Sequence, residues 1–232
     1  MFEKVNGLDL YYEEYGSENG EAVIFLHGNG GSVKTFERTK DVFLRDKRVF
    51  LIDSRGHGQS AFEGDIDFPA MGSDIADFVR AKGLDSVSLV GYSDGGIVAI
   101  EAAALLGGVV KKMVIIGANL RFDGMKSVFN LGLRIEYALF SLLSFMPKYK
   151  KLRRYFRIML TQPEITAEKL KSVTARTLVV AGERDVIKAE HTAEIAEKLP
   201  NAELTIVPGA DHFLFSKRNG EINEIIRGFL CG

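Results

Sequence analysis

The chain has 232 residues, of which 46% are hydrophobic and 26% charged, and its formal net charge is −1. This composition is typical of a globular protein long enough to bury a full core, and its charge balance, without any recognition motif, argues against nucleic-acid binding. The one cysteine, Cys231, excludes an intrachain disulfide and a cysteine metal cluster.

Short apolar runs follow one another along the chain. The first segment, Lys4–Tyr15, alternates in polarity and contains Asn6-Gly7, which predicts an antiparallel hairpin at a sheet edge. Six β-branched runs without alternation then predict buried strands of a parallel sheet. They occupy residues 22–26, 49–52, 87–90, 113–116, 177–181 and 204–207.

Helical segments lie between these runs. We expect them at about 33–45, 70–82, 95–107, 188–199 and 219–230. Strands that alternate with helices predict an α/β fold, here a doubly wound, mostly parallel sheet with the antiparallel hairpin at its amino-terminal end.

One long stretch, about 119–165, has no strand pattern. It is too long for a plain loop in a compact domain, so it predicts a small helical lid inserted after the sixth strand. The chain would then be a single domain, 1–232, with its core formed by 1–118 and 166–232.

The expected lid is rich in aromatic and basic side chains. Some of its aromatic residues should face a pocket, which would favour a small substrate with an apolar acyl or aromatic part. The basic run KYKKLRRYFR reads as a solvated helix face, or as a surface that attracts an acidic substrate or an anionic membrane. The aromatic residues considered are Phe129, Tyr137, Phe140, Phe145, Tyr149 and Phe156.

A nucleophile motif, Gly91-Tyr92-Ser93-Asp94-Gly95, directly follows the strand at 87–90 and precedes the helix at 95–107. This is the G-x-S-x-G elbow in its expected context. The two glycines avoid collisions in a tight turn that exposes the Ser93 hydroxyl. The backbone N–H of Asp94 would lie at a helix amino terminus, where it could stabilise an oxyanion.

With this motif the chain resembles the α/β-hydrolase family over nearly its whole length. The matching segments are His27-Gly28-Asn29-Gly30, Asp53 to Ser60, Gly91 to Gly95, Gly182 to Asp185, and Gly209 to His212. Their order and spacing together are specific, although each motif alone is weak.

The resemblance implies roles for particular residues. His212 would be the general base and Asp185 the acid that orients it, in the chain order Ser93, Asp185, His212. The backbone N–H of Asn29, with Gly30 next, would join that of Asp94 in the oxyanion hole. Glu183, Asp211 and Asp123 remain alternatives for the acid.

The three other histidines should not take part in the chemistry. His27 and His57 are expected to be structural, and His191 is expected to be solvated on a surface helix. No cofactor is implied, and the chain lacks the H-E-x-x-H pattern of a zinc hydrolase.

The sequence therefore predicts a serine hydrolase that cleaves a small carboxylic ester through an acyl-enzyme. The same residues could serve a thioesterase, a lactonase or a carbon–carbon bond hydrolase, and a ligand-binding sensor with little turnover is a further alternative. Because no signal peptide or membrane span is recognisable, we expect a cytoplasmic protein without stable membrane insertion. Whether it is a monomer or a homodimer stays open.

Overall fold

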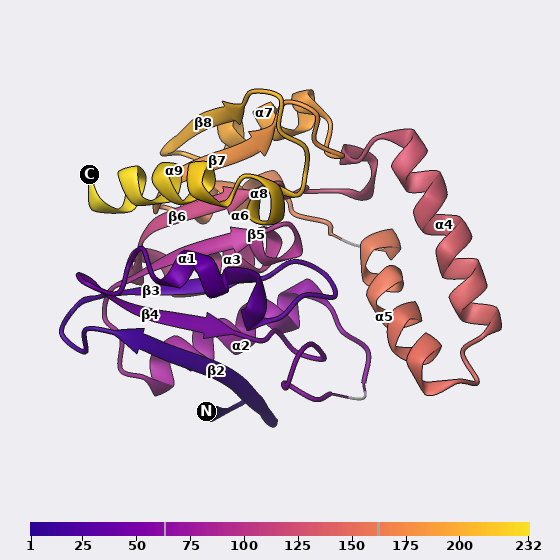
Figure 1. Ribbon diagram of the computed structural model, residues 1–232, viewed down its shortest axis with the longest axis horizontal. Helices are drawn as coiled ribbons and strands as arrows, with labels where there is room; N and C mark the ends of the chain where they lie inside the picture. The colour runs from indigo at the N-terminus through magenta and orange to yellow at the C-terminus, as the bar shows by residue number, and fades with distance from the viewer. Residues whose placement is uncertain (63, 162) are drawn as a thin grey trace.

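The computed structural model describes residues 1–62, 64–161 and 163–232 (Figure 1). One eight-stranded sheet forms its centre, in the order β1-β2-β4-β3-β5-β6-β7-β8. β1 pairs with β2, and β2 with β4, in antiparallel fashion, and all the other neighbouring strands are parallel. The predicted α/β sheet with an antiparallel amino-terminal pair is therefore confirmed.

Strands and helices alternate through most of the chain. The strands are β1 (Phe2–Val5), β2 (Leu8–Gly16), β3 (Glu21–Leu26), β4 (Lys47–Ile52), β5 (Val87–Tyr92), β6 (Val110–Ile116), β7 (Arg176–Gly182) and β8 (Ala202–Val207). The α-helices are α1 (Glu37–Lys40), α2 (Phe68–Ala81), α3 (Asp94–Leu106), α4 (Ser127–Leu142), α5 (Pro147–Thr161), α6 (Ala167–Ser172), α7 (Ala189–Lys198), α8 (Leu214–Lys217) and α9 (Asn219–Cys231). Three 3₁₀-helices, η1 (Val33–Phe36), η2 (Gly107–Val109) and η3 (Phe122–Gly124), connect them.

The first hairpin turns at the residues that predict it. Asn6 and Gly7 adopt φ values of 44° and 71° between β1 and β2. Positive φ at both central residues is the geometry of a type I′ turn, whose twist matches that of the paired strands. Gly7 adopts it without steric cost, and Asn tolerates it better than most side chains.

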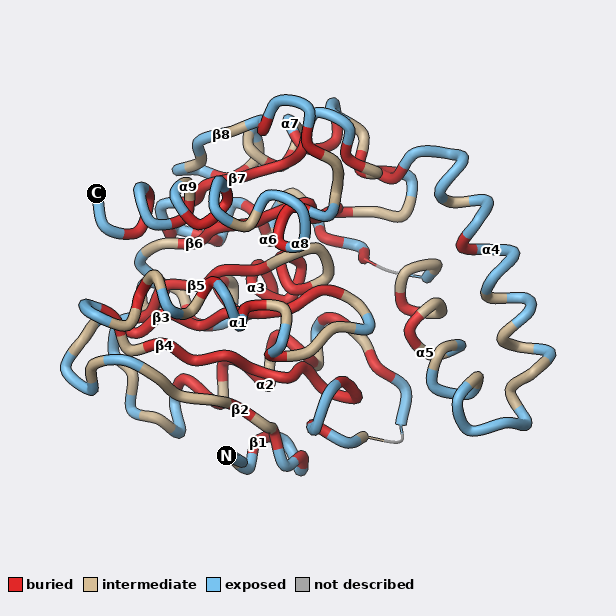
Figure 2. The backbone as a smooth tube through the Cα atoms, viewed as in Figure 1, coloured by how far each residue is buried: buried red, intermediate tan, exposed pale blue. Residues whose placement is uncertain are grey.

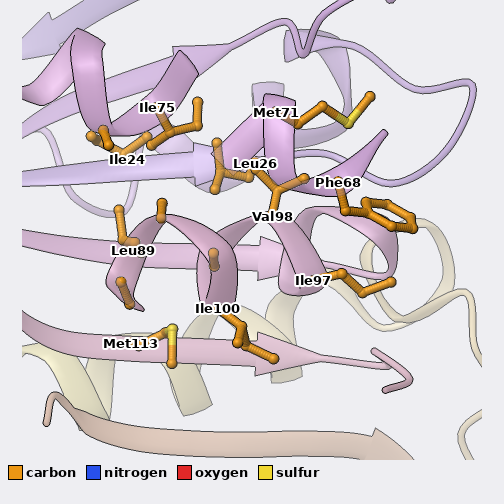
Figure 3. Packing of buried hydrophobic residues seen from close by; sticks show 14 of the residues in the cluster. Ile24, Leu26, Phe68, Met71, Ile75, Leu89, Ile97, Val98, Ile100 and Met113 are labelled. Carbon is orange, nitrogen blue, oxygen red and sulfur yellow. The ribbon is translucent and has the colours of Figure 1, made fainter. Parts of the chain in front are cut away.

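Both faces of the sheet are buried, which explains why the central strands lack polar alternation. In β3, Ile24 and Leu26 point to the face covered by α2 and α3 (Figure 3). Val23 and Phe25 point to the other face, where they pack with residues of η1, α8 and α9. Consecutive side chains of a strand alternate between its two sides, so each side needs its own apolar layer.

Two of the predicted elements differ from the structure. In place of the helix expected at 33–45, the structure has the two short helices η1 and α1. Phe36, at the end of η1, and Phe43, beyond α1, both pack on Phe25. The strand expected to be buried at 204–207 belongs to β8, where Leu204 and Ile206 are exposed. β8 is an edge strand and therefore has a neighbour on one side only.

The helical lid follows β6, as predicted. α4 and α5 form an antiparallel pair beyond the carboxyl ends of the parallel strands (Figure 1). Most of α4 is exposed, whereas α5 lies closer to the core (Figure 2). The predicted lid range includes residue 162, which lies outside the described residues. Among the residues described, no helix has the length and apolarity needed to cross a lipid bilayer.

Candidate active site

The nucleophile elbow joins β5 to α3. Ser93 has φ 54° and ψ −121°, a backbone conformation that non-glycine residues rarely adopt. A Cβ atom on Gly91 would overlap the carbonyl oxygen of Gly95, and one on Gly95 would overlap that of Leu26. Both glycines of the motif are therefore sterically required, as the sequence pattern predicts.

A hydrogen-bonded chain runs from Ser93 through His212 to Asp185. The Nε2 atom of His212 lies 3.1 Å from Ser93 Oγ, and its Nδ1 atom lies 2.8 Å from Asp185 Oδ1. With the Nδ1 proton donated to the carboxylate, Nε2 is free to accept the serine hydroxyl proton. The structure thus brings together the three side chains that the sequence proposes, in the geometry of a nucleophile, a base and an orienting acid.

Asp185 is almost completely buried in the turn that follows β7. Burial alone would raise its pKa, but the hydrogen bond and charge of His212, with the backbone N–H of Ile187, outweigh this effect, and the pKa is lowered. The carboxylate is therefore held in its charged form. Lys126 also donates a hydrogen bond to the backbone carbonyl of Asp185.

The alternative acids have other partners. Glu183 accepts a hydrogen bond from the backbone N–H of Gly209. Asp211 forms an ion pair with Lys217, and Oδ1 of Asp123 lies 3.3 Å from Nε of Arg121. In the described residues only Asp185 has a carboxylate within hydrogen-bond distance of the His212 ring.

Two further residues fix the position of the histidine ring. Gly117, directly after β6, has φ +61°, and a Cβ atom there would lie 3.0 Å from the imidazole of His212 and 3.3 Å from Asp185 Oδ2. Tyr92 donates its hydroxyl to the backbone carbonyl of His212 at 2.9 Å. The sequence patterns do not point to Gly117. Tyr92 occupies the first unspecified position of the G-x-S-x-G motif, which assigns it no role.

Two backbone N–H groups beside Ser93 are available to a substrate. Those of Asn29 and Asp94 both border the cavity that contains Ser93, and within the described part of the chain neither has a hydrogen-bond acceptor. The loop before Asn29 comes close to the nucleophile, because a Cβ atom on Gly28 would lie 3.0 Å from Ser93 Cβ. Asp94 is the first residue of α3, where the helix dipole favours negative charge.

The carboxyl group of Asp94, the residue after Ser93, has a shifted pKa. Burial raises its pKa to about 7, although the nearby charge of His212 and a hydrogen bond from Asn29 act in the opposite direction. Asn29 also donates its side-chain N–H to the backbone carbonyl of Tyr155 at 2.8 Å. Asn29, one of the two candidate oxyanion donors, is thus linked to the lid.

His27 and His57 are structural, as expected. His27 is buried. Its Nδ1 atom lies 2.7 Å from the carbonyl oxygen of Gly28, and its Nε2 atom accepts a hydrogen bond from the backbone N–H of Ser54 at 3.0 Å, so the ring joins two loops of the site. His57 stacks on Tyr155 with ring centroids 4.3 Å apart, and burial lowers its pKa to about 3.

The expectation for His191 is wrong. Its side chain is buried rather than solvated, and its Nε2 atom accepts the backbone N–H of Leu120 at 2.8 Å. The first turn of α7 packs against the segment that leads into the lid, so closely that a Cβ atom on Gly124 would overlap the ring. Burial accordingly lowers the pKa of His191.

A cavity of about 710 Å³ opens beside Ser93 and His212. From the helices α4 and α5, five apolar or aromatic residues line it, namely Phe129, Leu152, Tyr155, Phe156 and Met159. Charged residues line it as well, among them Lys34, Glu37 and Arg38. Of the lid aromatics considered from the sequence, only Phe129 and Phe156 border the cavity in the described structure.

Tyr155 is another residue bordering the cavity that the sequence interpretation missed. It lies within the basic run, yet its side chain is buried, and its hydroxyl donates to the carbonyl of Gly56 at 2.9 Å. The spacing of 152, 155, 156 and 159 is that of one helix face and would have predicted a common pocket-facing side.

Metal ligands do not gather in the described part of the chain, where no three His, Cys, Asp or Glu side chains come together in a suitable group.

Comparisons with known proteins support this description. The model of the alpha/beta hydrolase fold family matches residues 21–152. Serine hydrolase BPHL of Mus musculus is 30% identical over 97% of this chain and 84% of that protein.

Solved structures share the architecture. The enol-lactonase from Burkholderia xenovorans LB400 superposes with a TM-score of 0.83 at 16% identity, over the whole of both chains. Est816, described as an N-acyl homoserine lactone degrading enzyme, superposes with a TM-score of 0.81 at 25% identity, over 98% of this chain and 99% of its own. With the family model matching more than half of its length, the chain belongs to the α/β-hydrolase family.

Proposed function

We propose that this protein is a serine hydrolase that cleaves a small carboxylic ester through an acyl-enzyme on Ser93. The observation that carries the proposal is the continuous chain from Ser93 Oγ through the His212 ring to Asp185. It lies beside two backbone N–H groups that have no acceptor among the described residues. A nucleophile, an oriented base and oxyanion donors are the parts that acyl transfer requires.

In the proposed acylation step, His212 Nε2 takes the hydroxyl proton as Ser93 Oγ attacks the carbonyl carbon of the ester. The carbonyl oxygen becomes an oxyanion, which the N–H groups of Asn29 and Asp94 stabilise. Asp185 holds the imidazole in the required tautomer and stabilises its charged form. His212 then returns the proton to the leaving alkoxide, and the acyl group stays on Ser93.

In the proposed deacylation step, a water molecule gives a proton to His212 and attacks the acyl carbon. A second oxyanion forms at the same two donors, and its collapse releases the carboxylic acid and restores the Ser93 hydroxyl. Removal of one oxyanion donor in such a site lowers the rate by about 10²–10³-fold.

The cavity supports a substrate with an apolar acyl or aromatic part. Its volume, about 710 Å³, is within the range of small-molecule pockets, and the residues that line it from α4 and α5 are apolar or aromatic. The charged lining residues Lys34, Glu37 and Arg38 would suit a polar group elsewhere on the substrate.

A lactone is the second candidate substrate, since it is a cyclic ester and needs the same steps. Two proteins named for action on lactones share this fold with TM-scores of 0.83 and 0.81. The two candidates differ only in whether the leaving alkoxide remains attached to the acyl group.

Turnover of p-nitrophenyl esters of graded acyl length, next to a panel of γ-lactones, tests the proposal. Ser93→Ala should abolish turnover and labelling by a fluorophosphonate probe, whereas Ser172→Ala, on the surface helix α6, should preserve both. Failure of the wild-type protein to react with the esters, the lactones and the probe would refute the serine hydrolase assignment.

A further inference from the structure

We propose that the outer face of the lid hairpin, α4 with the first turn of α5, binds the surface of an anionic lipid bilayer. The proposal concerns a surface rather than the cavity and does not depend on the proposed function.

The first observation is an apolar stripe that the core does not cover. Large apolar side chains recur every three or four residues along α4, which places them on one helix face. Leu142 is 76% exposed and Phe145, in the turn after α4, is 80% exposed. The other members are Val128, Leu131, Ile135 and Leu139.

The opposite face of α4 is the one that packs against the rest of the protein. Leu133 is buried, and the ring of Phe140 lies 4.9 Å from that of Phe156 in α5. The stripe is therefore not needed for packing of the described chain. Figure 2 shows α4 exposed along most of its length, on the side of the molecule farthest from the sheet.

The second observation is the charge beside the stripe. Residues 127–161 contain seven Lys and Arg residues and one acidic residue, Glu136, so this segment carries a charge of +6 while the remaining chain carries −7. Arg157 pairs with Asp65, but no described carboxylate forms an ion pair with Lys148, Lys150 or Lys151. These three lysines lie at the start of α5, just after the turn that contains Phe145 and Met146.

Apolar side chains next to unpaired lysines are the chemistry of a helix that lies in a membrane interface. The apolar groups enter the boundary between headgroups and acyl chains, and the lysines meet anionic lipid phosphates. A symmetric contact between two copies of this face would instead bring like charges together, since residues 127–151 carry four Lys and Arg residues against the single Glu136. Charge complementarity therefore favours an anionic lipid surface over a second copy.

Co-sedimentation with vesicles measures this binding. Wild-type protein should bind vesicles of phosphatidylcholine containing one-third phosphatidylglycerol, and should be released by high salt or by omission of phosphatidylglycerol. The triple variant K148Q/K150Q/K151Q should bind about a hundredfold more weakly, at about fivefold for each lysine near the surface. The double variant L142S/F145S should lose more than about tenfold.

Matched controls separate this face from general charge and apolarity. K4Q/K111Q/K171Q removes three lysines elsewhere on the surface, and L105S removes an exposed leucine of α3; both should bind as the wild type does. Thermal melting shows that each variant is folded. Absence of wild-type binding at low salt, equal weakening in the control variants, or a concentration-dependent mass that the α4 variants abolish would each overturn the proposal, the last in favour of a second copy.

Discussion

Replacement of Gly117 by alanine tests how closely the site depends on the position of one imidazole. The native φ of +61° costs an L-residue about 1–2 kcal/mol, so the variant should lose that much stability. The new Cβ would also lie 3.0 Å from the His212 ring and 3.3 Å from Asp185 Oδ2, so these groups must move by a few tenths of an ångström. Since a misplacement of 1 Å can cost about 10²-fold in rate, we expect kcat to fall about tenfold.

The chain offers a matched control for this change. Gly83 has φ +62°, and nothing lies within 4 Å of a Cβ built there. Gly83→Ala should therefore lose only the backbone cost of about 1–2 kcal/mol in urea denaturation, while kcat on an ester stays unchanged. Equal kcat values for the two variants would refute the argument that Gly117 makes room for the His212 ring.

Three further changes give distinct results. Asp185→Asn should lower kcat by up to about 10⁴-fold, the loss known for this exchange in a Ser-His-Asp triad, whereas Asp211→Asn should leave kcat nearly unchanged in the same assay. Burial raises the pKa of Asp94 to about 7, against about 3.9 in an unfolded chain. Its contribution to stability is therefore full below about pH 4 and is lost as the pH rises through about 7, so Asp94→Asn should melt at increasingly higher temperature than wild type between about pH 5 and pH 8. Tyr155→Phe should lower the free energy of unfolding by about 1–3 kcal/mol, because the buried Gly56 carbonyl loses its donor.

Much of the sheet could be predicted because its signals are local. The G-x-S-x-G pattern needs a strand before it and a helix after it, and both β5 and α3 have strong patterns of their own. The Asn6-Gly7 turn is equally local. The long-range neighbours of Ser93 came instead from a family resemblance, since no periodicity relates residue 93 to residues 185 and 212.

The errors arise where burial depends on the spatial order of elements. Leu204 belongs to an apolar run, but β8 is the last strand of the sheet, and the run itself does not show this. His191 has polar neighbours in α7, and it is buried by the approach of the segment that contains Leu120 and Gly124. Gly117 was overlooked because its requirement comes from His212, which lies 95 residues later in the chain.

The lid is connected to the proposed oxyanion hole as well as to the substrate wall. Asn29 donates its side-chain N–H to the backbone carbonyl of Tyr155 at 2.8 Å. Tyr155→Phe removes the hydroxyl but keeps the carbonyl and the ring stacked on His57. It should therefore reduce stability while kcat on an ester stays within about twofold, because the rate depends on donor positions that this exchange leaves in place. A fall in kcat as large as that expected for loss of an oxyanion donor would show that the hydroxyl, and not the backbone contact, holds the Asn29 loop against Ser93.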